Sequence, residues 1–366
     1  MNKVNKEFLT LQAIGIFIVV VGHKDGSMVF SDWFPAYSFH MPLFIFISGY
    51  FYKQIYDNKP FEYIKKKFTS LVITYFIWNL VYGLLGVFLS SNNLINHQVE
   101  LTFETFFIEP WITGHQYHIN VASWFLLSLF LVQVTHVLMK YLVVKCSKVK
   151  EYFLLIVYFS VGLLSLLLAS RGYHYDGYLT IVRTLFLLPF FQLGYVYHLN
   201  ESKIKISNTI YFAVLFSIQF ILIYKYHNLN FSAVFLGDIR EDYYFLPYLT
   251  SITGILFWLR IAKIVTPIVA DNKLVQLIGQ NTLSIMLHHQ FIFWLINFGL
   301  YSVKGSIELT SFDVEAFKSN MWYSYTPTTN HFYIIYVLLG IGIPIAFKYV
   351  IEKSKLVTKD NHKFQN

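Results

Sequence analysis

The sequence predicts an all-α integral membrane protein, a bundle of about ten transmembrane helices with both termini in the cytoplasm. Hydrophobic residues make up 56% of the 366 residues, and charged residues make up 13%, about half of the roughly 25% usual in soluble domains. Apolar runs long enough to cross a bilayer, roughly 20 residues each, recur along the chain. Lysine and arginine gather in alternate loops between these runs.

We expect membrane spans near residues 8–23, 35–52, 68–90, 121–143, 152–169, 179–197, 209–226, 244–264, 275–301 and 332–351. Each should be a helix, because a bilayer offers unpaired backbone groups no partners. With a cytoplasmic N-terminus, the cytoplasmic segments carry 21 of the 28 Lys and Arg residues and the outer segments carry six, which follows the positive-inside rule. We expect one membrane domain over residues 1–352 and a polar cytoplasmic tail over 353–366.

Composition also narrows the function classes. The net charge of +8 follows from this topology and does not indicate nucleic-acid binding. Cys146 is the single cysteine, so no intrachain disulfide and no cysteine metal cluster can form. Histidine pairs with the spacing of metal ligands are absent from the spans, so we predict no metal site. The sequence contains no P-loop, GxGxxG or GxSxG motif.

The first two spans carry histidines at their outer ends. His23 closes the first span, and Gln12, eleven residues and about three turns earlier, lies on nearly the same face. His23 is either a base with a polar partner or an interfacial residue that ends the helix. His40 opens the second span, where Pro42 is tolerated because first-turn N–H groups lack helical partners. We expect His23 and His40 to line one outer cavity, and the apolar run after Pro42 to face the bilayer.

The third span follows the basic segment KPFEYIKKKF. Lys65, Lys66 and Lys67 are candidates for contact with donor phosphates, although topology and attraction to anionic lipid also explain them. In the sixth span, Arg183 either snorkels to the outer interface or has an anionic or carbonyl partner inside the bundle.

The ninth span contains two adjacent histidines, His288 and His289. Neighbouring helical residues point about 100° apart, so only one can face the pocket of His23. We favour His289, because Asn281 lies eight residues earlier on nearly the same face. The outer segment 302–330 is rich in Ser, Thr, Tyr and Trp, which fits either an interfacial aromatic belt or a platform for sugars.

Five motifs, in order, resemble the acyltransferase type 3 family of integral-membrane O-acyltransferases over roughly residues 8–350. They are VVVGH, FHMPLFIFISGYFY, ASWFLLSLF, LPFFQLGYVY and IGQNTLSIMLHH. The His-His form of the last motif is most similar to capsule, exopolysaccharide or fucose-type O-acetyltransferases. The resemblance implies transfer of an acetyl or other short acyl group from acyl-CoA to a sugar hydroxyl. It implies acetyl-CoA as co-substrate, no tightly bound cofactor, a polysaccharide or lipid-linked sugar as acceptor, and a bacterial plasma membrane.

The resemblance makes His23 the expected general base, with a transiently acylated His23 as the alternative. Candidates for substrate or oxyanion support are Gln12, His40, Arg183, Asn281 and His289. The family carries an arginine at the position of Gln12. Either Arg183 supplies the positive charge from another helix, or this branch uses a different arrangement, or catalysis is altered.

Two other functions remain open at this point. A transporter or exporter of a glycan or lipid-linked intermediate also has kinked helices and intramembrane polar groups. We find no repeat symmetry between the halves of the chain, which favours the enzyme. The third interpretation is an inactive accessory subunit, because the family arginine is missing.

Overall fold

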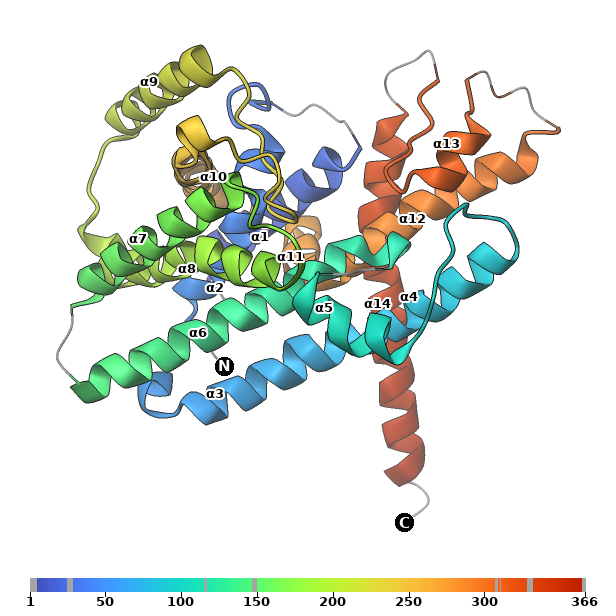
Figure 1. Ribbon diagram of the computed structural model, residues 1–366, viewed down its shortest axis with the longest axis horizontal. Helices are drawn as coiled ribbons and strands as arrows, with labels where there is room; N and C mark the ends of the chain where they lie inside the picture. The colour runs from blue at the N-terminus through green and yellow to red at the C-terminus, as the bar shows by residue number, and fades with distance from the viewer. Residues whose placement is uncertain are drawn as a thin grey trace.

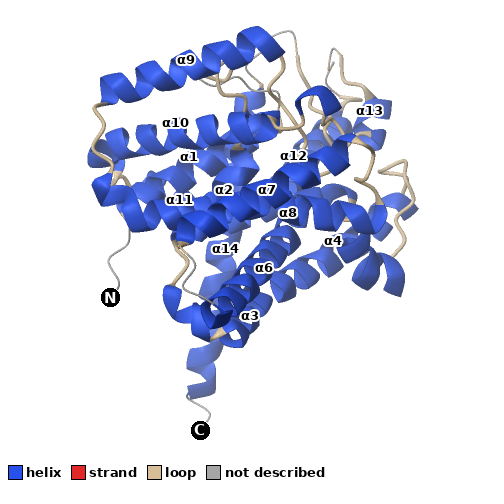
Figure 2. Ribbon diagram, turned by 60° about the vertical axis from the view of Figure 1, so that its left-hand side comes forward, coloured by secondary structure: helices blue, strands red, loops and turns tan. Residues whose placement is uncertain are grey.

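The computed structural model describes residues 5–24, 29–114, 117–146, 150–306, 309, 311–327 and 332–363. These residues form helices and loops with no strand (Figure 2). The longer helices are α1 (Lys6–Gly22), α2 (His40–Tyr50), α4 (Ile73–Ser91), α6 (Trp124–Cys146), α7 (Glu151–Ser170), α8 (Asp176–Asn200), α9 (Asn208–Tyr226), α10 (Leu246–Val269), α12 (Thr282–Val303) and α14 (Tyr333–Lys363). The shorter ones are α3 (Pro60–Lys67), α5 (Glu109–Ile112), α11 (Lys273–Gln280) and α13 (Val314–Ser319).

Eight of these helical segments are long and apolar enough to cross a membrane, which confirms an all-α integral membrane protein. The difference from ten lies at the start of the chain. Helix α1 has 17 residues and α2 has 11, so both are shorter than a full span. The expected span 275–301 is also broken, because Asn281 leaves the helical conformation and separates α11 from α12.

Helix α2 lies inside the bundle, and our expectation that its apolar run faces the bilayer was wrong. Residues along its whole length are buried, including Leu43, Ile45 and Phe46. Its closest packing is against α8, where glycines allow the two backbones to touch. A Cβ on Gly49 would lie 1.9 Å from the Phe191 carbonyl oxygen, and one on Gly194 would lie 2.0 Å from that of Phe46. Small residues permit this close approach of membrane helices.

Helix α1 lies among α2, α10 and α11 (Figures 1 and 2). It packs against α2, α10, α11, α12 and α14. These contacts explain why α1 itself carries apolar residues around most of its circumference. Helix α9 lies at the periphery, where it packs on α10 (Figure 1). The last turns of α14 extend beyond the other helices and include most of the segment expected to be a tail.

A buried ion cluster joins three elements at the lysine-rich end of the bundle. Lys140 on α6 lies 3.4 Å from the carboxylate of Asp57, in the turn before α3, and also pairs with Glu151 at the start of α7. Tyr52 donates a hydrogen bond to Asp57 at 2.8 Å. Burial nevertheless raises the pKa of Asp57. The cluster therefore depends on Lys140, because removing it would leave two carboxylates with little compensation.

Candidate active site

Three histidines from separate helices meet at the end of α1. His23 caps α1, His40 begins α2, and His289 lies two turns into α12. The His23 ring lies 5.0 Å from that of His289 and 6.4 Å from that of His40. Each ring is held by a helix end or a helix interior, so the group is fixed by the bundle rather than by a long loop.

The hydrogen bonds of His289 set the protonation of His23. Nδ1 of His289 lies 2.8 Å from the carbonyl oxygen of Ile285 and 2.9 Å from that of Met286. Carbonyl oxygens only accept, so this nitrogen carries a proton. In a neutral His289 the other nitrogen, Nε2, is then an acceptor, and it lies 3.0 Å from Nδ1 of His23.

His23 therefore donates from Nδ1 and keeps an unprotonated Nε2. Within the residues that the structure describes, no hydrogen bond occupies this Nε2. A base held in one tautomer by a second residue is the arrangement of serine-hydrolase triads. The pair can thus accept a proton from a hydroxyl in the adjoining space.

His40 has a comparable anchor. Its Nδ1 lies 2.5 Å from the Ala36 carbonyl oxygen, in the short 3₁₀ turn Ala36–Ser38 before α2. Ser251 on α10 donates to the Ser38 carbonyl oxygen at 2.9 Å and holds that turn against the bundle. The Nε2 atom of His40 therefore points away from Ala36. His40 and Pro42 both lie in the first turn of α2, where the histidine bonds the preceding turn and the proline is tolerated.

Trp322, in the loop between α13 and α14, covers His23. The two rings lie 5.1 Å apart and nearly parallel, at 24°. Lys24, the residue after His23, holds that loop: its ammonium group donates to the Tyr323 carbonyl oxygen at 3.1 Å and to the Ser324 hydroxyl at 2.9 Å. The end of α1 therefore positions both the histidine and the tryptophan that lies over it.

A cavity of about 380 Å³ adjoins His23. This volume lies within the range of about 300–1,000 Å³ usual for small-molecule sites. Side chains from α1, α2, α6, α12 and the loops around them line it, and His23 and His40 supply its imidazole rings. The lining includes Val19, His23, Tyr37, His40, Met41, Trp124, Ser232, Val234, Met286 and Trp322.

A second cavity, of about 370 Å³, adjoins the first at the lysine-rich side. The two share Val19, Met41 and Met286 in their walls. One face of α1 runs along both, because its lining residues, Gln12, Ile16, Val19 and His23, follow the helical repeat. Gln12 and His23 are therefore about 16 Å apart along the helix at 1.5 Å per residue.

Two lysines that the sequence singled out line this second cavity. They are Lys66 and Lys67, and Lys53 joins them, whereas Lys65 is exposed and lies outside the lining. Lys66 donates to the Tyr56 hydroxyl at 3.4 Å. The cavity therefore has three cationic groups at one end and apolar walls toward the histidines.

Arg183 and Asn281 lie apart from the histidines. Arg183 is buried: Nη1 donates to the Val234 carbonyl oxygen at 2.9 Å, and the guanidinium lies 4.8 Å from the Trp124 ring. Its partner is thus a carbonyl group inside the bundle, behind the wall of the His23 cavity. Asn281 donates to the Leu277 carbonyl oxygen at 2.6 Å and serves the break between α11 and α12.

The comparison with known families agrees with this arrangement. The family model described as an acyltransferase domain matches residues 6–349, nearly the whole chain. The chain belongs to the acyltransferase 3 family. No curated protein and no solved structure matches the chain significantly. The protein is therefore a membrane-bound acyltransferase, and the resemblance inferred from the five motifs is confirmed at the level of the family.

The arginine that the resemblance implies at position 12 is absent from this acyltransferase, which has Gln12 there. Gln12 lines the same cavity as Lys53, Lys66 and Lys67. Arg183 lies behind the other cavity and lines neither of the two. The cations that share a cavity with Gln12 are therefore these lysines and not Arg183.

Sequence reasoning missed two residues of this acyltransferase site, Lys24 and Trp322. Trp322 belongs to the outer segment noted for its aromatic content, which was the available signal. Lys24 was counted only as an outer-loop charge. Neither could be connected to His23 from spacing, because Trp322 lies about 300 residues further along the chain.

Proposed function

We propose that this acyltransferase moves an acetyl or other short acyl group from acyl-CoA to a sugar hydroxyl. The acceptor is a cell-surface polysaccharide or a lipid-linked sugar, and the enzyme works in a bacterial plasma membrane. The donor enters through the lysine-lined cavity on the cytoplasmic side, and the acceptor reaches His23 from outside. The distribution of Lys and Arg supports this orientation.

The observation that carries the proposal is that the lysine-lined cavity and the His23 cavity share Val19, Met41 and Met286 in their walls. An acyl-CoA has an anionic nucleotide at one end, a long pantetheine arm, and a thioester at the other. Lys53, Lys66 and Lys67 offer cations for its phosphates, since ammonium groups bind phosphate as point charges. The distance of about 16 Å from Gln12 to His23 is comparable to an extended pantetheine arm.

The reaction uses His23 as a general base. Nε2 of His23 takes the proton of the sugar hydroxyl while the hydroxyl oxygen attacks the thioester carbonyl carbon. The carbon–sulfur bond then breaks, and the leaving thiolate takes the proton from the His23 imidazolium. The products are an O-acyl sugar and CoA with a free thiol. His289 supports this sequence because its Nε2 accepts from Nδ1 of His23 throughout.

The test is the ester content of the producing cell's surface glycan, measured by proton NMR before and after mild base. A deletion strain is complemented with wild type, with His23→Ala, or with the matched control His288→Ala, at equal membrane levels. His288 is suitable because its ring bonds Tyr82 at 2.7 Å rather than His23. We expect base-labile ester to disappear in the deletion and His23→Ala strains and to persist in the control.

Other outcomes separate the rival functions. Glycan exported with unchanged ester in every strain would exclude the acyl transfer. Glycan trapped inside the deletion strain would instead support a transporter. Normal ester content in the His23→Ala strain, with ester lost in the deletion strain, would mean that the protein is an acyltransferase but that His23 is not its base.

A further inference from the structure

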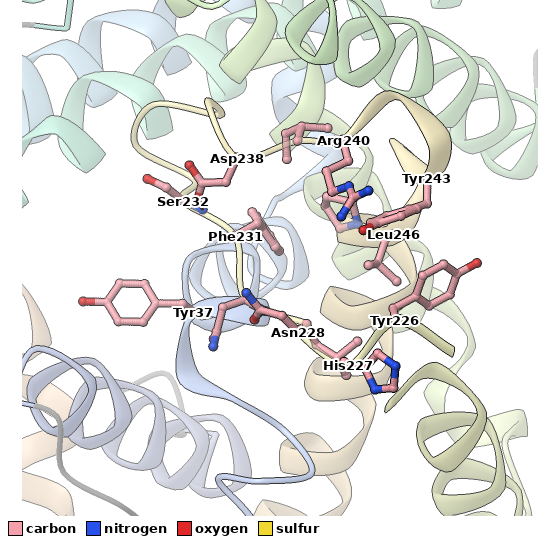
Figure 3. A pocket seen from close by; sticks show the side chains of 14 residues that line it. Tyr37, Tyr226, His227, Asn228, Phe231, Ser232, Asp238, Arg240, Tyr243 and Leu246 are labelled. Carbon is pink, nitrogen blue, oxygen red and sulfur yellow. Dashed lines mark hydrogen bonds between the residues drawn. The ribbon is translucent and has the colours of Figure 1, made fainter. Parts of the chain in front are cut away.

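A third cavity opens beside the His23 cavity, between the end of α9 and the start of α10 (Figure 3). Its volume is about 500 Å³. It shares Tyr37 and Ser232 with the His23 cavity, so the two cavities are neighbours. The rest of the lining comes from the end of α9, the segment 228–231, the turn 238–243 and the start of α10.

The chain after α9 alternates between buried and accessible side chains. Leu229 and Phe231 are buried in the bundle, while Asn228 and Asn230 are exposed and Ser232 is half-buried. This period of two is the pattern of an extended segment with one apolar face and one polar face. Residues of both faces line the cavity. On the polar face, Asn228 Oδ1 accepts from the Asn230 backbone N–H at 3.0 Å, and Ser232 Oγ accepts from the Phe235 N–H at 3.5 Å. Within the described part of the chain, the side-chain amide of Asn230 has no hydrogen-bond partner.

The segment is held in place before any ligand arrives. Asp238 accepts a hydrogen bond from the Ser232 backbone N–H at 3.0 Å, and the Leu236 N–H donates to the Ser232 carbonyl oxygen at 2.8 Å. The buried Arg183 guanidinium holds the Val234 carbonyl oxygen from behind. Leu236 itself has a positive φ of 53°, an unfavourable conformation for this residue that the surrounding bonds maintain.

Aromatic side chains form the far wall. Tyr226, Tyr243 and Arg240 lie on one side of the cavity (Figure 3). The Tyr226 and Tyr243 rings lie 5.0 Å apart, and the Arg240 guanidinium lies 4.9 Å from the Tyr243 ring. Arg240 and Asp238 are the charged residues of the lining, and their charges cancel. The Arg240 guanidinium also lies 3.8 Å from the carboxylate of Asp242, outside the lining, in an exposed pair. The cavity therefore offers planar hydrogen-bonding groups and aromatic faces without net charge. It suits a hydroxyl-rich, uncharged ligand, in contrast to the lysine-lined cavity.

We infer that this cavity binds the sugar units next to the one that is acylated, so the acceptor is an oligosaccharide or polymer rather than a free monosaccharide. The inference rests on the proposed function. The glycan attached to a pyranose at His23 would extend past Tyr37 and Ser232 into this cavity, which is larger than one sugar ring needs. Asn230 and Arg240 bind its hydroxyls, and Tyr243 stacks on a ring face.

The acceptor for the test is the deletion strain's glycan, freed of ester by mild base and cut by partial acid hydrolysis into monosaccharide and oligosaccharide fractions. Full-length protein in nanodiscs is assayed with acetyl-CoA as Asn230→Ala/Arg240→Ala, as Tyr243→Ala, and as the control Asn92→Ala. Asn92 is an exposed asparagine at the end of α4 and lines none of the three cavities.

We expect KM for the oligosaccharide to rise by about tenfold or more in the double variant, which corresponds to about 1.4 kcal/mol. Transfer to the monosaccharide fraction and KM for acetyl-CoA should stay unchanged. An unchanged oligosaccharide KM, or an equal rise for both fractions, would overturn the inference.

A binding measurement separates this inference from the proposed function. Saturation-transfer NMR follows the oligosaccharide on His23→Ala protein, with and without Asn230→Ala/Arg240→Ala. Binding lost only in the combined variant supports the cavity even if wild type transfers no acyl group. If wild type transfers the acyl group and the double substitution leaves oligosaccharide binding unchanged, the inference about this cavity is wrong and the proposed function is retained.

Discussion

Replacing His289 tests the tautomer argument directly. His289→Leu removes the acceptor that faces Nδ1 of His23 at 3.0 Å, while leaving His23 in place. Without that acceptor, the proton of His23 can move to Nε2, the nitrogen that must be free to accept the sugar's proton. We therefore expect a lower kcat, with little change in KM for either substrate.

The size of the loss follows from the single hydrogen bond involved. A neutral hydrogen bond contributes about 0.5–1.5 kcal/mol net, so its removal should lower kcat by roughly 2- to 12-fold. Removing the base itself with His23→Ala should lower the rate by roughly 10²–10⁴-fold. The two variants therefore differ by at least about tenfold if His289 acts only by positioning His23.

The assay is release of free CoA thiol in the presence of the acceptor glycan, with purified protein in nanodiscs. His289→Gln is the conservative variant, because its amide oxygen can accept from Nδ1 of His23. It should recover most of the activity that His289→Leu loses. His288→Leu serves as the matched control, since the neighbouring ring bonds Tyr82.

Two results would refute the reasoning. Wild-type kcat in His289→Leu would mean that the His289 bond does not set the tautomer of His23. A loss as large as that of His23→Ala, without recovery in His289→Gln, would mean that His289 takes part in proton transfer itself.

Three further predictions concern the rest of the molecule. Lys66→Gln/Lys67→Gln should raise KM for acyl-CoA by about tenfold or more, with the acceptor KM unchanged, because two cations facing the donor phosphates are lost; Lys65→Gln, outside the cavity, is the control, and an equal effect there would contradict donor binding. Gly49→Ala should lower stability by about 1–3 kcal/mol in thermal unfolding in detergent, because the new Cβ would meet the Phe191 carbonyl oxygen; Gly342→Ala, with open space around it, should have no such effect, and matching melting temperatures would argue against the tight α2–α8 contact. Lys140→Met should destabilise by about 3–5 kcal/mol in the same assay, since Asp57 and Glu151 lose their buried cation; Lys348→Met breaks an exposed pair and should change stability by about 1 kcal/mol or less, so similar losses in both variants would speak against the cluster.

Several features of the site could be read from local spacing. The helical repeat placed Gln12 and His23 on one face of α1, and the structure has both on the face that lines the two cavities. The same geometry allows one of two adjacent histidines to face His23, and His289 lies against it while His288 bonds Tyr82. These inferences depend only on the rotation per residue of a helix.

Other features could not be read this way. The apolar composition of α2 fits either lipid or a protein interior, because both are equally apolar environments. Its burial depends on Gly49 and Gly194 meeting the backbone of the opposite helix. Asn281 has the helical phase expected of a site residue, yet its side chain bonds Leu277 at a break between two helices.

The sequence by itself determined the membrane class, the helical content and the family, because these follow from composition, periodicity and contiguous motifs. Only the tertiary structure decided which polar groups share a space. It brought Trp322 and Lys24 to His23, bound Arg183 to the Val234 carbonyl oxygen outside both cavities, and placed a lysine-lined cavity beside a histidine-lined one. The physical reason is that contacts between residues tens or hundreds of positions apart depend on how whole helices pack, and no local spacing encodes that packing.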